Sequence, residues 1–208
     1  MMTTTLRHES SEPAHTFARS GVEAGWTRST ARDATLARCG LARDVFAARD
    51  VRVAEEATAD LVGMAPAGTV ARIWTADVAT YRTWLGVSDP RAAIAGEPAY
   101  DPAALAAAPL HGAAADALAR IARAYLFADV APVARFAPAI EQHFGPFEAV
   151  VVVLRRLTIA PGARLVIAGA PTILVADCVD VHDGADVTLT TICHAALGVL
   201  TRHGALRR

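Results

Sequence analysis

The sequence predicts an α+β protein in which a helical N-terminal region packs on a short C-terminal parallel β-helix with coils of about 22 residues. Three observations lead to this fold class. Apolar residues at helical spacing dominate residues 29–146, strand-forming residues dominate from Phe147 onward, and a repeat lies within the second of these parts. We therefore expect a flexible arm at 1–28, a mainly helical region at 29–146 and a short β-solenoid at 147–208.

The composition limits the classes of function. The chain has 208 residues, 53% of them hydrophobic, and a formal net charge of −1, so we expect neither a disordered chain nor a nucleic-acid partner. All 20 basic residues are arginine, which excludes a lysine Schiff base and the lysine of a phosphate-binding loop. Three cysteines, a polar N-terminus and apolar runs too short for a bilayer predict a cytoplasmic protein without a membrane segment.

The region before Phe147 is assigned from apolar spacing and capping residues. Residues 1–28 are polar and lack sustained periodicity, so we expect them to be flexible. Asp101 followed by Pro102 is typical of the cap and first position of a helix. We expect helices at 29–50, 75–85, 111–130 and 133–143, a short helix beginning at Pro102, and strands at 51–53 and 70–74.

Two segments of the C-terminal part repeat each other. Residues 157–167 and 179–189 match at a constant offset of 22 positions, and each has a Gly-Ala pair between two apolar stretches. Gly162 and Gly184 fit corners at which the backbone needs a positive φ. A fixed period with such corners is typical of parallel β-helix coils, and a third, imperfect coil follows from Cys193 onward.

The phrase LxIxPGAxLVIxG, from Leu157 to Gly169, resembles the repeats of β-helix (β-solenoid) proteins, including the polysaccharide-lyase-like and bactofilin-like kinds. The resemblance covers residues 147–205 and implies stacked strands without implying an activity. The alternative is a meander of two similar antiparallel hairpins, because Pro161-Gly162 and Asp183-Gly184 are also good hairpin turns.

Strand alternation assigns the two faces of these strands. Leu165, Ile173 and Val181 are expected to point into the interior. Asp180 and His182 are expected to point outward, toward solvent.

The outward acids are the candidate catalytic residues. Polysaccharide lyases and hydrolases built on β-helices place carboxylates on an outward strand face, which makes Asp180, His182 and Asp183 candidates. At the offset of 22, however, Thr158 lies below Asp180, so no second layer of acids supports them. We therefore favour a solvated face without a catalytic role.

The same stretch holds the candidate metal ligands Cys178, His182, Cys193 and His194. Their spacing contains neither C-x-x-C nor H-E-x-x-H. We therefore expect no bound metal and no other cofactor.

Two further groups are candidate ligand-binding residues. Arg155 and Arg156 open the first coil and suit an anion such as phosphate or a carboxylate sugar, although we favour protection of a sheet edge. Trp74, Tyr81 and Trp84 lie close together in the sequence, and we favour a place in the helical core over a stacking platform.

These observations predict a non-catalytic β-solenoid module for self-assembly or partner binding. The alternative is a small enzyme or lectin-like protein that acts on a carbohydrate or another small ligand. Because the residues after Thr201 are too few to cover the last coil, we expect a homodimer formed through the C-terminal coil. If Leu206 instead folds back as a plug, the protein stays monomeric.

Overall fold

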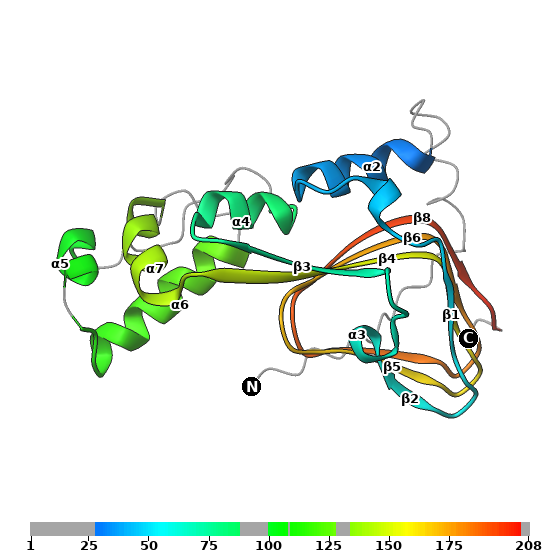
Figure 1. Ribbon diagram of the computed structural model, residues 1–208. Helices are drawn as coiled ribbons and strands as arrows, with labels where there is room; N and C mark the ends of the chain where they lie inside the picture. Colours follow the sequence, from blue (N-terminus) through cyan, green and yellow to red (C-terminus); the bar gives the residue numbers. More distant parts are fainter. Residues whose placement is uncertain (1–27, 88–99, 108, 128–133, 205–208) are drawn as a thin grey trace. The chain divides into compact units, whose positions relative to one another are not determined.

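The computed structural model describes residues 28–87, 100–107, 109–127 and 134–204 (Figure 1). The predicted arm at 1–28 lies almost wholly outside these residues. The described part of the chain contains six α-helices, two short 3₁₀ helices and eight strands, so the α+β class is confirmed. Contacts divide the chain into two compact units, one made of the described parts of Met1–Ile73 and Ala149–Arg208, the other of Trp74–Glu148.

The first unit contains the strands, of which β3 and β4 continue for two residues each into the second unit. Its N-terminal elements are α2 (Arg28–Arg38), η1 (Arg43–Val45), β1 (Asp50–Val53), β2 (Thr58–Asp60), α3 (Leu61–Met64) and β3 (Val70–Thr75). Its C-terminal elements are β4 (Phe147–Ile159), β5 (Arg164–Ile167), β6 (Thr172–Val181), β7 (Asp186–Leu189) and β8 (Cys193–Arg202).

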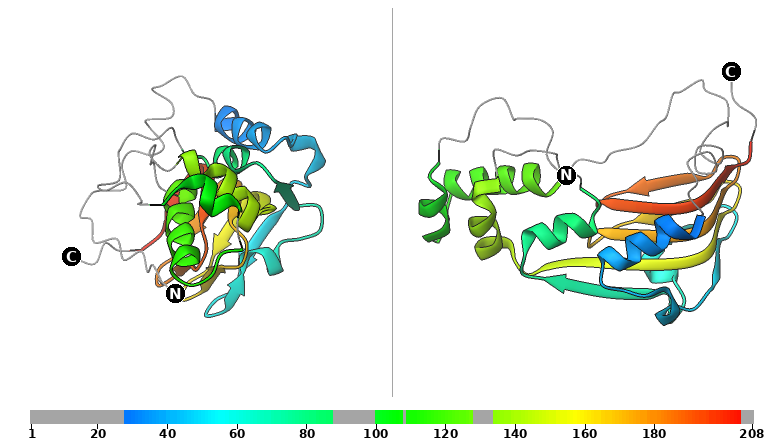
Figure 2. Two further views of the ribbon diagram at one scale, coloured as in Figure 1. Left: turned by 90° about the vertical axis from the view of Figure 1, so that its left-hand side faces the viewer. Right: turned by 90° about the horizontal axis from the view of Figure 1, so that it is seen from above.

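The strands form two sheets. The first has five strands in the order β1-β4-β6-β8, with β3 also paired to β4, and the second has three strands in the order β2-β5-β7. The pairs β1–β4, β4–β6, β6–β8, β2–β5 and β5–β7 are all parallel, and Figure 2 shows these strands lying side by side. The alternative of antiparallel hairpins is therefore wrong.

The repeat found in the sequence sets the register of the sheets. Leu157 pairs with Val179, and Leu165 pairs with Val187, so both pairs join residues 22 positions apart. The turns that precede β5 and β7 contain Gly162 and Gly184, which adopt the expected positive φ angles of 67° and 70°. Apolar residues at matching positions therefore lie side by side within one sheet.

The prediction of a β-solenoid repeat protein is nevertheless wrong. It built the coils from residues 147–208 alone and assigned the strands expected at 51–53 and 70–74, which form as β1 and β3, to a mainly helical region. The structure instead has two parallel sheets that take β1, β2 and β3 from residues 50–75, outside the repeat. The chain contains two good copies of the repeat, whereas repeat architectures need at least about three to bury a continuous core. The fold is α+β with two parallel sheets, and a C-terminal β-helix carrying a helical cap is not what forms.

Strands β4 and β6 turn a corner at Arg155 and Asp177, where the ladder of paired residues skips one position on each strand (Figure 1). The skipped residue shifts the alternation of faces. Leu174 faces the interior before the corner, and Val179 faces it afterwards. Ile173, expected in the interior, is fully buried but lies on the other face of the sheet, the side on which α2 packs.

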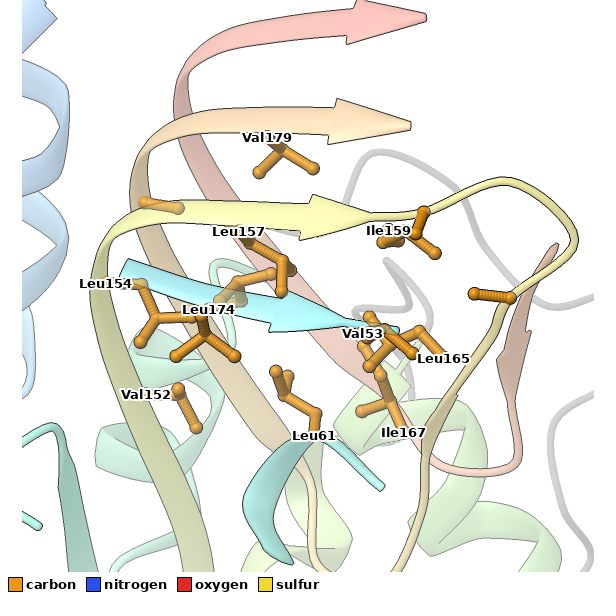
Figure 3. Packing of buried hydrophobic residues seen from close by; sticks show 14 of the residues in the cluster. Val53, Leu61, Val152, Leu154, Leu157, Ile159, Leu165, Ile167, Leu174 and Val179 are labelled. Atoms are coloured by element: carbon orange, nitrogen blue, oxygen red, sulfur yellow. The ribbon is translucent and has the colours of Figure 1, made fainter. Parts of the chain in front are cut away.

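The interior between the two sheets is apolar, and Figure 3 shows side chains from both sheets converging there. Leu165 lies in this cluster as expected, and Val181 packs against it. Each fully buried aliphatic side chain contributes about 1.5–3 kcal/mol through removal of apolar surface from water. The fully buried members include Val53, Leu61, Leu157, Ile159 and Leu165.

The second unit is mainly helical. Its elements are α4 (Val78–Trp84), α5 (Pro102–Ala107), α6 (Ala113–Phe127), η2 (Ala134–Phe136) and α7 (Ala137–Phe144). The expected cap is confirmed, because the Asp101 carboxylate accepts a 3.1 Å hydrogen bond from the backbone N–H of Ala103. Within the described ranges, no helix is both long enough and apolar enough to cross a bilayer.

Candidate functional site

The two ends of the apolar interior are covered differently. At one end lie β1 and β2, which are only four and three residues long. Charged residues such as Arg52 and Asp60 are exposed on them. Helix α3 follows β2 directly and places Leu61, with 0% of its surface exposed, against the interior. Short, charged strands and a covering helix are the usual protection of a sheet edge.

The other end is formed by β7 and β8, which we call the open edge. Each is the last strand in the order of its sheet. Val187, Leu189 and Leu197 pack on the interior but are only partly buried, and Leu200 is 56% exposed. Strand β8 is ten residues long and has no charged residue between His194 and Arg202. A long, apolar and unpaired strand edge is a ready template for pairing with another chain.

Beside the open edge, three elements meet at a polar contact that we call the Asp177 corner. Arg32 of α2 reaches Asp177 of β6, with 2.7 Å between Nη1 and Oδ1. Arg43 of η1 donates to both oxygens of the same carboxylate, at 2.8 and 3.0 Å. Gly198 of β8 leaves the space, because a Cβ there would overlap both the Arg32 guanidinium and the Asp177 carbonyl. The corner therefore fixes α2 on β6 and β8.

A second contact holds α2 on β8. Arg38 Nη2 lies 3.1 Å from Nε2 of His194 and 3.3 Å from the hydroxyl of Thr35. Burial, and secondly the nearby charge of Arg38, lower the pKa of His194. The neutral imidazole can accept a hydrogen bond from Arg38 through Nε2. Helix α2 thus occupies the outer face of β8, and no described strand pairs with the free edge of β8.

The candidate catalytic residues lie close together, and their side chains contact neighbouring residues. Asp180 stands between Arg156, 3.8 Å away, and His203, 3.7 Å away. The ring of His182 stacks on that of His203 with 4.5 Å between centroids. Asp183 lies in the next turn, against the backbone of Gly204. Their carboxylates and imidazoles thus form a polar outer surface, and their catalytic role stays a prediction.

The candidate ligand-binding residues differ in their burial and in their partners. Arg155 makes two hydrogen bonds to Asp50, of 2.7 and 2.6 Å, and so ties β4 to the edge strand β1. The hydrogen bond from Arg155 lowers the pKa of Asp50. Tyr81 and Trp84 are buried, with 6.3 Å between their ring centroids, whereas Trp74 is 57% exposed.

The candidate metal ligands are dispersed. Cys178 lies on the outer face of β6 beside Arg156, while Cys193 packs against the interior, where burial raises its pKa to about 11. His194 contacts α2, and His182 lies beyond the end of β6. Among the residues that the structure describes, no three His, Cys, Asp or Glu side chains are arranged to hold a metal ion.

A small groove open to solvent lies next to the Asp177 corner, between the segment after η1 and β4. Its volume is about 60 Å³, and its lining includes Val153 and Leu154. Phe46 forms one wall, and Arg43 and Arg155 stand at its rim. Both arginines are already bound to carboxylates, which limits what they can offer to a ligand.

Sequence reasoning missed the Asp177 corner. Arg32, Asp177 and Gly198 are far apart in the chain, and helical spacing alone gives Arg32 no special role. One local signal existed, because a glycine within a strand often marks close approach by another group, and Gly198 is such a glycine. No known protein family, curated protein or solved structure matches the chain. The open edge and the Asp177 corner are therefore the features from which a function has to be argued.

Proposed function

We propose that the protein is a non-catalytic module for self-assembly or partner binding, and that it binds through the open edge. The observation that carries this proposal is the difference between the two ends of the interior. Leu61 of the helix that covers one end is fully buried, whereas Leu200 at the other end is 56% exposed. Exposed apolar surface of this kind, next to unpaired strand backbone, is typical of a protein-binding surface.

The simplest partner is a second copy of the chain, which gives a homodimer. A two-fold interface needs one self-complementary surface, and the open edge offers apolar side chains and backbone donors and acceptors together. Absence of a nucleic-acid partner and a cytoplasmic location belong to the same proposal. The three cysteines, Cys39, Cys178 and Cys193, are free thiols in the structure, which supports a reducing compartment.

The alternative is a small enzyme or lectin-like protein acting on a carbohydrate or another small ligand, and it would use the groove between Phe46 and β4. At about 60 Å³ this groove is far smaller than ordinary ligand pockets, which measure about 300–1,000 Å³. Its rim arginines, Arg43 and Arg155, suit an anionic group, but both are engaged with Asp177 and Asp50. The open edge therefore has the stronger support.

Light scattering coupled to size-exclusion chromatography tests the proposal. The parent chain is expected to show the mass of a dimer. Leu200→Arg adds a charge at an already exposed position and should give a folded monomer, as should Leu197→Arg if the fold tolerates it. Ala54→Arg at the opposite end is the matched control, because Ala54 is exposed outside the open edge.

A dimer for the parent and for Ala54→Arg, with a monomer for Leu200→Arg, supports the proposal. Circular dichroism of each variant serves as the control for folding. A parent chain that remains monomeric at the highest attainable concentration contradicts self-assembly. A dimer that survives Leu200→Arg and Leu197→Arg places the interface elsewhere.

A further inference from the structure

We infer that self-assembly stops at a dimer in which β8 pairs antiparallel with β8 of a second copy, across a two-fold axis that passes beside Ala195. This inference rests on the proposed function, because it concerns the same open edge. Beyond the proposed function, it specifies which strand of the second copy pairs with β8, the direction of that strand and the register of the pair. It also excludes a filament, which the open edge alone would allow.

The closed form follows from the covered end of the interior. A filament requires β8 of one copy to pair with β1 of the next, in a head-to-tail contact that repeats. Strand β1 has only four residues, and its exposed Asp50 and Arg52 are bound to Arg155 and Glu55. Leu61 of α3 is fully buried against the interior there, so a helix already occupies the place that a second interior would need. Of the two strand edges that the structure describes, only another open edge therefore suits the open edge.

Charges within the open edge select the segment that pairs. Beyond the corner at Gly198, Arg202 occupies the register position of the partly buried Val181, so a charge stands at an inward position. Inward charges on an edge strand oppose further pairing. Strand β7 has four residues and carries Asp186, which lies 3.3 Å from Arg164. The remaining segment is 193–197, which contains no aspartate, glutamate or arginine. Leu200 lies just beyond this segment, so Leu200→Arg places a charge at the margin of the contact.

Ala195 is the middle residue of this segment. It pairs with Leu174 of the interior and so faces inward, yet it is exposed, because no described strand follows β8 in the sheet. In an antiparallel pair centred on it, Ala195 lies opposite its own copy, with Cα atoms about 4.5–5.5 Å apart. Cys193 lies opposite Leu197 in that register. The two native Cys193 residues are therefore too far apart to form a disulfide.

Disulfide trapping tests this register. The variant Ala195→Cys, prepared with Cys178→Ser to remove an outward thiol, brings two thiols within the range that a disulfide requires, about 4.4–6.8 Å between Cα atoms. Thr201→Cys in the same background is the matched control, because Thr201 lies on the same strand beyond the corner. The Cys178→Ser chain alone reports any cross-link through the native thiols. Each is incubated with a mild oxidant and run on a non-reducing gel, with light scattering on the reduced sample.

The inference predicts a dimer mass for every reduced sample and a cross-linked dimer in most of the Ala195→Cys chain, with little in either control. A dimer that does not cross-link at position 195 overturns the register and leaves self-assembly standing. Species larger than a dimer overturn the closed form and also leave self-assembly standing. A monomer in all samples overturns this inference together with the proposed function.

Discussion

Nη1 of Arg32 occupies the space that a side chain at Gly198 would need. Arg32 comes from the first described helix, α2, and Gly198 from the last strand, β8. Their close approach brings the Arg32 guanidinium to Asp177 of the neighbouring strand, β6. Only 8% of the Arg32 side chain is exposed. One glycine thus determines whether α2 can pack on the sheet and anchor the strand that forms the open edge.

Gly198→Ala is expected to destabilise the protein by about 1–3 kcal/mol, the usual cost of inserting a methyl group into a packed site. The added Cβ would overlap the Arg32 guanidinium and the backbone of Asp177. Urea unfolding measures the change. Gly63→Ala is the milder comparison, because its Cβ would come 3.3 Å from Oδ1 of Asp60, a tight contact with a side chain, whereas at Gly198 the Cβ would overlap backbone; alanine also favours the helix. Equal stabilities for the two variants would show that the close approach does not matter.

Asp177→Ala is expected to cost about 3 kcal/mol, near the lower end of the range for breaking a buried ion pair, because Asp177 itself is partly exposed. The variant leaves the charge of Arg32 buried without a counter-ion. Asp50→Ala breaks the exposed pair with Arg155 and should change the urea midpoint little. If Asp177→Ala is as mild as Asp50→Ala, the corner does not anchor α2.

Stability is expected to fall as the pH decreases below about 6.5, the ordinary value for histidine. Burial and Arg38 lower the pKa of His194 in the folded chain, so the unfolded chain binds the additional proton first. The stabilising contribution is complete above that pH and is lost as the pH falls. Urea midpoints between pH 5 and 7 should vary less for His194→Gln than for the parent. Identical pH profiles would remove His194 from this account.

The three thiols are expected to react at different rates with a thiol-specific reagent at pH 8. Burial raises the pKa of Cys39 and of Cys193 to about 11, so very little reactive thiolate is present at either. Cys178 lies partly exposed on the outer face of β6 and should react first. Cys178→Ser should therefore abolish the fast phase. A fast phase that persists in this variant would mean that one of the other thiols becomes accessible in the native protein.

The sequence was informative where the structure depends on local pattern. The Gly-Ala turns, the strands of the repeat and the inward positions of Leu165 and Val181 follow from alternation and from the needs of positive φ. Alternation failed at Ile173, because the ladder of paired residues skips Asp177 at the corner. The residues before the corner that face the interior are therefore of the other parity. That corner has no clear local signature, because it depends on how two strands turn together.

The β-solenoid prediction failed for a related reason. The repeat identifies strands that resemble one another, but β1, β2 and β3 resemble neither copy and still complete the two sheets. The candidate site could likewise be predicted only in part. The apolar character of β8 can be recognised in the sequence, whereas the burial of Leu61 at the opposite end depends on tertiary packing. The link from Arg32 to Asp177 joins residues that no periodicity relates.

Amide hydrogen exchange, measured by mass spectrometry at low and high protein concentration, tests self-assembly at the open edge most directly. Amides on the free side of β8 have no described partner strand, so they exchange rapidly in a monomer and slowly once a second copy pairs there. The account predicts that peptides covering 193–197 become more protected as the concentration rises, while those covering β1 do not change. Exchange in 193–197 that is independent of concentration, over a range in which the mass shows association, would contradict it.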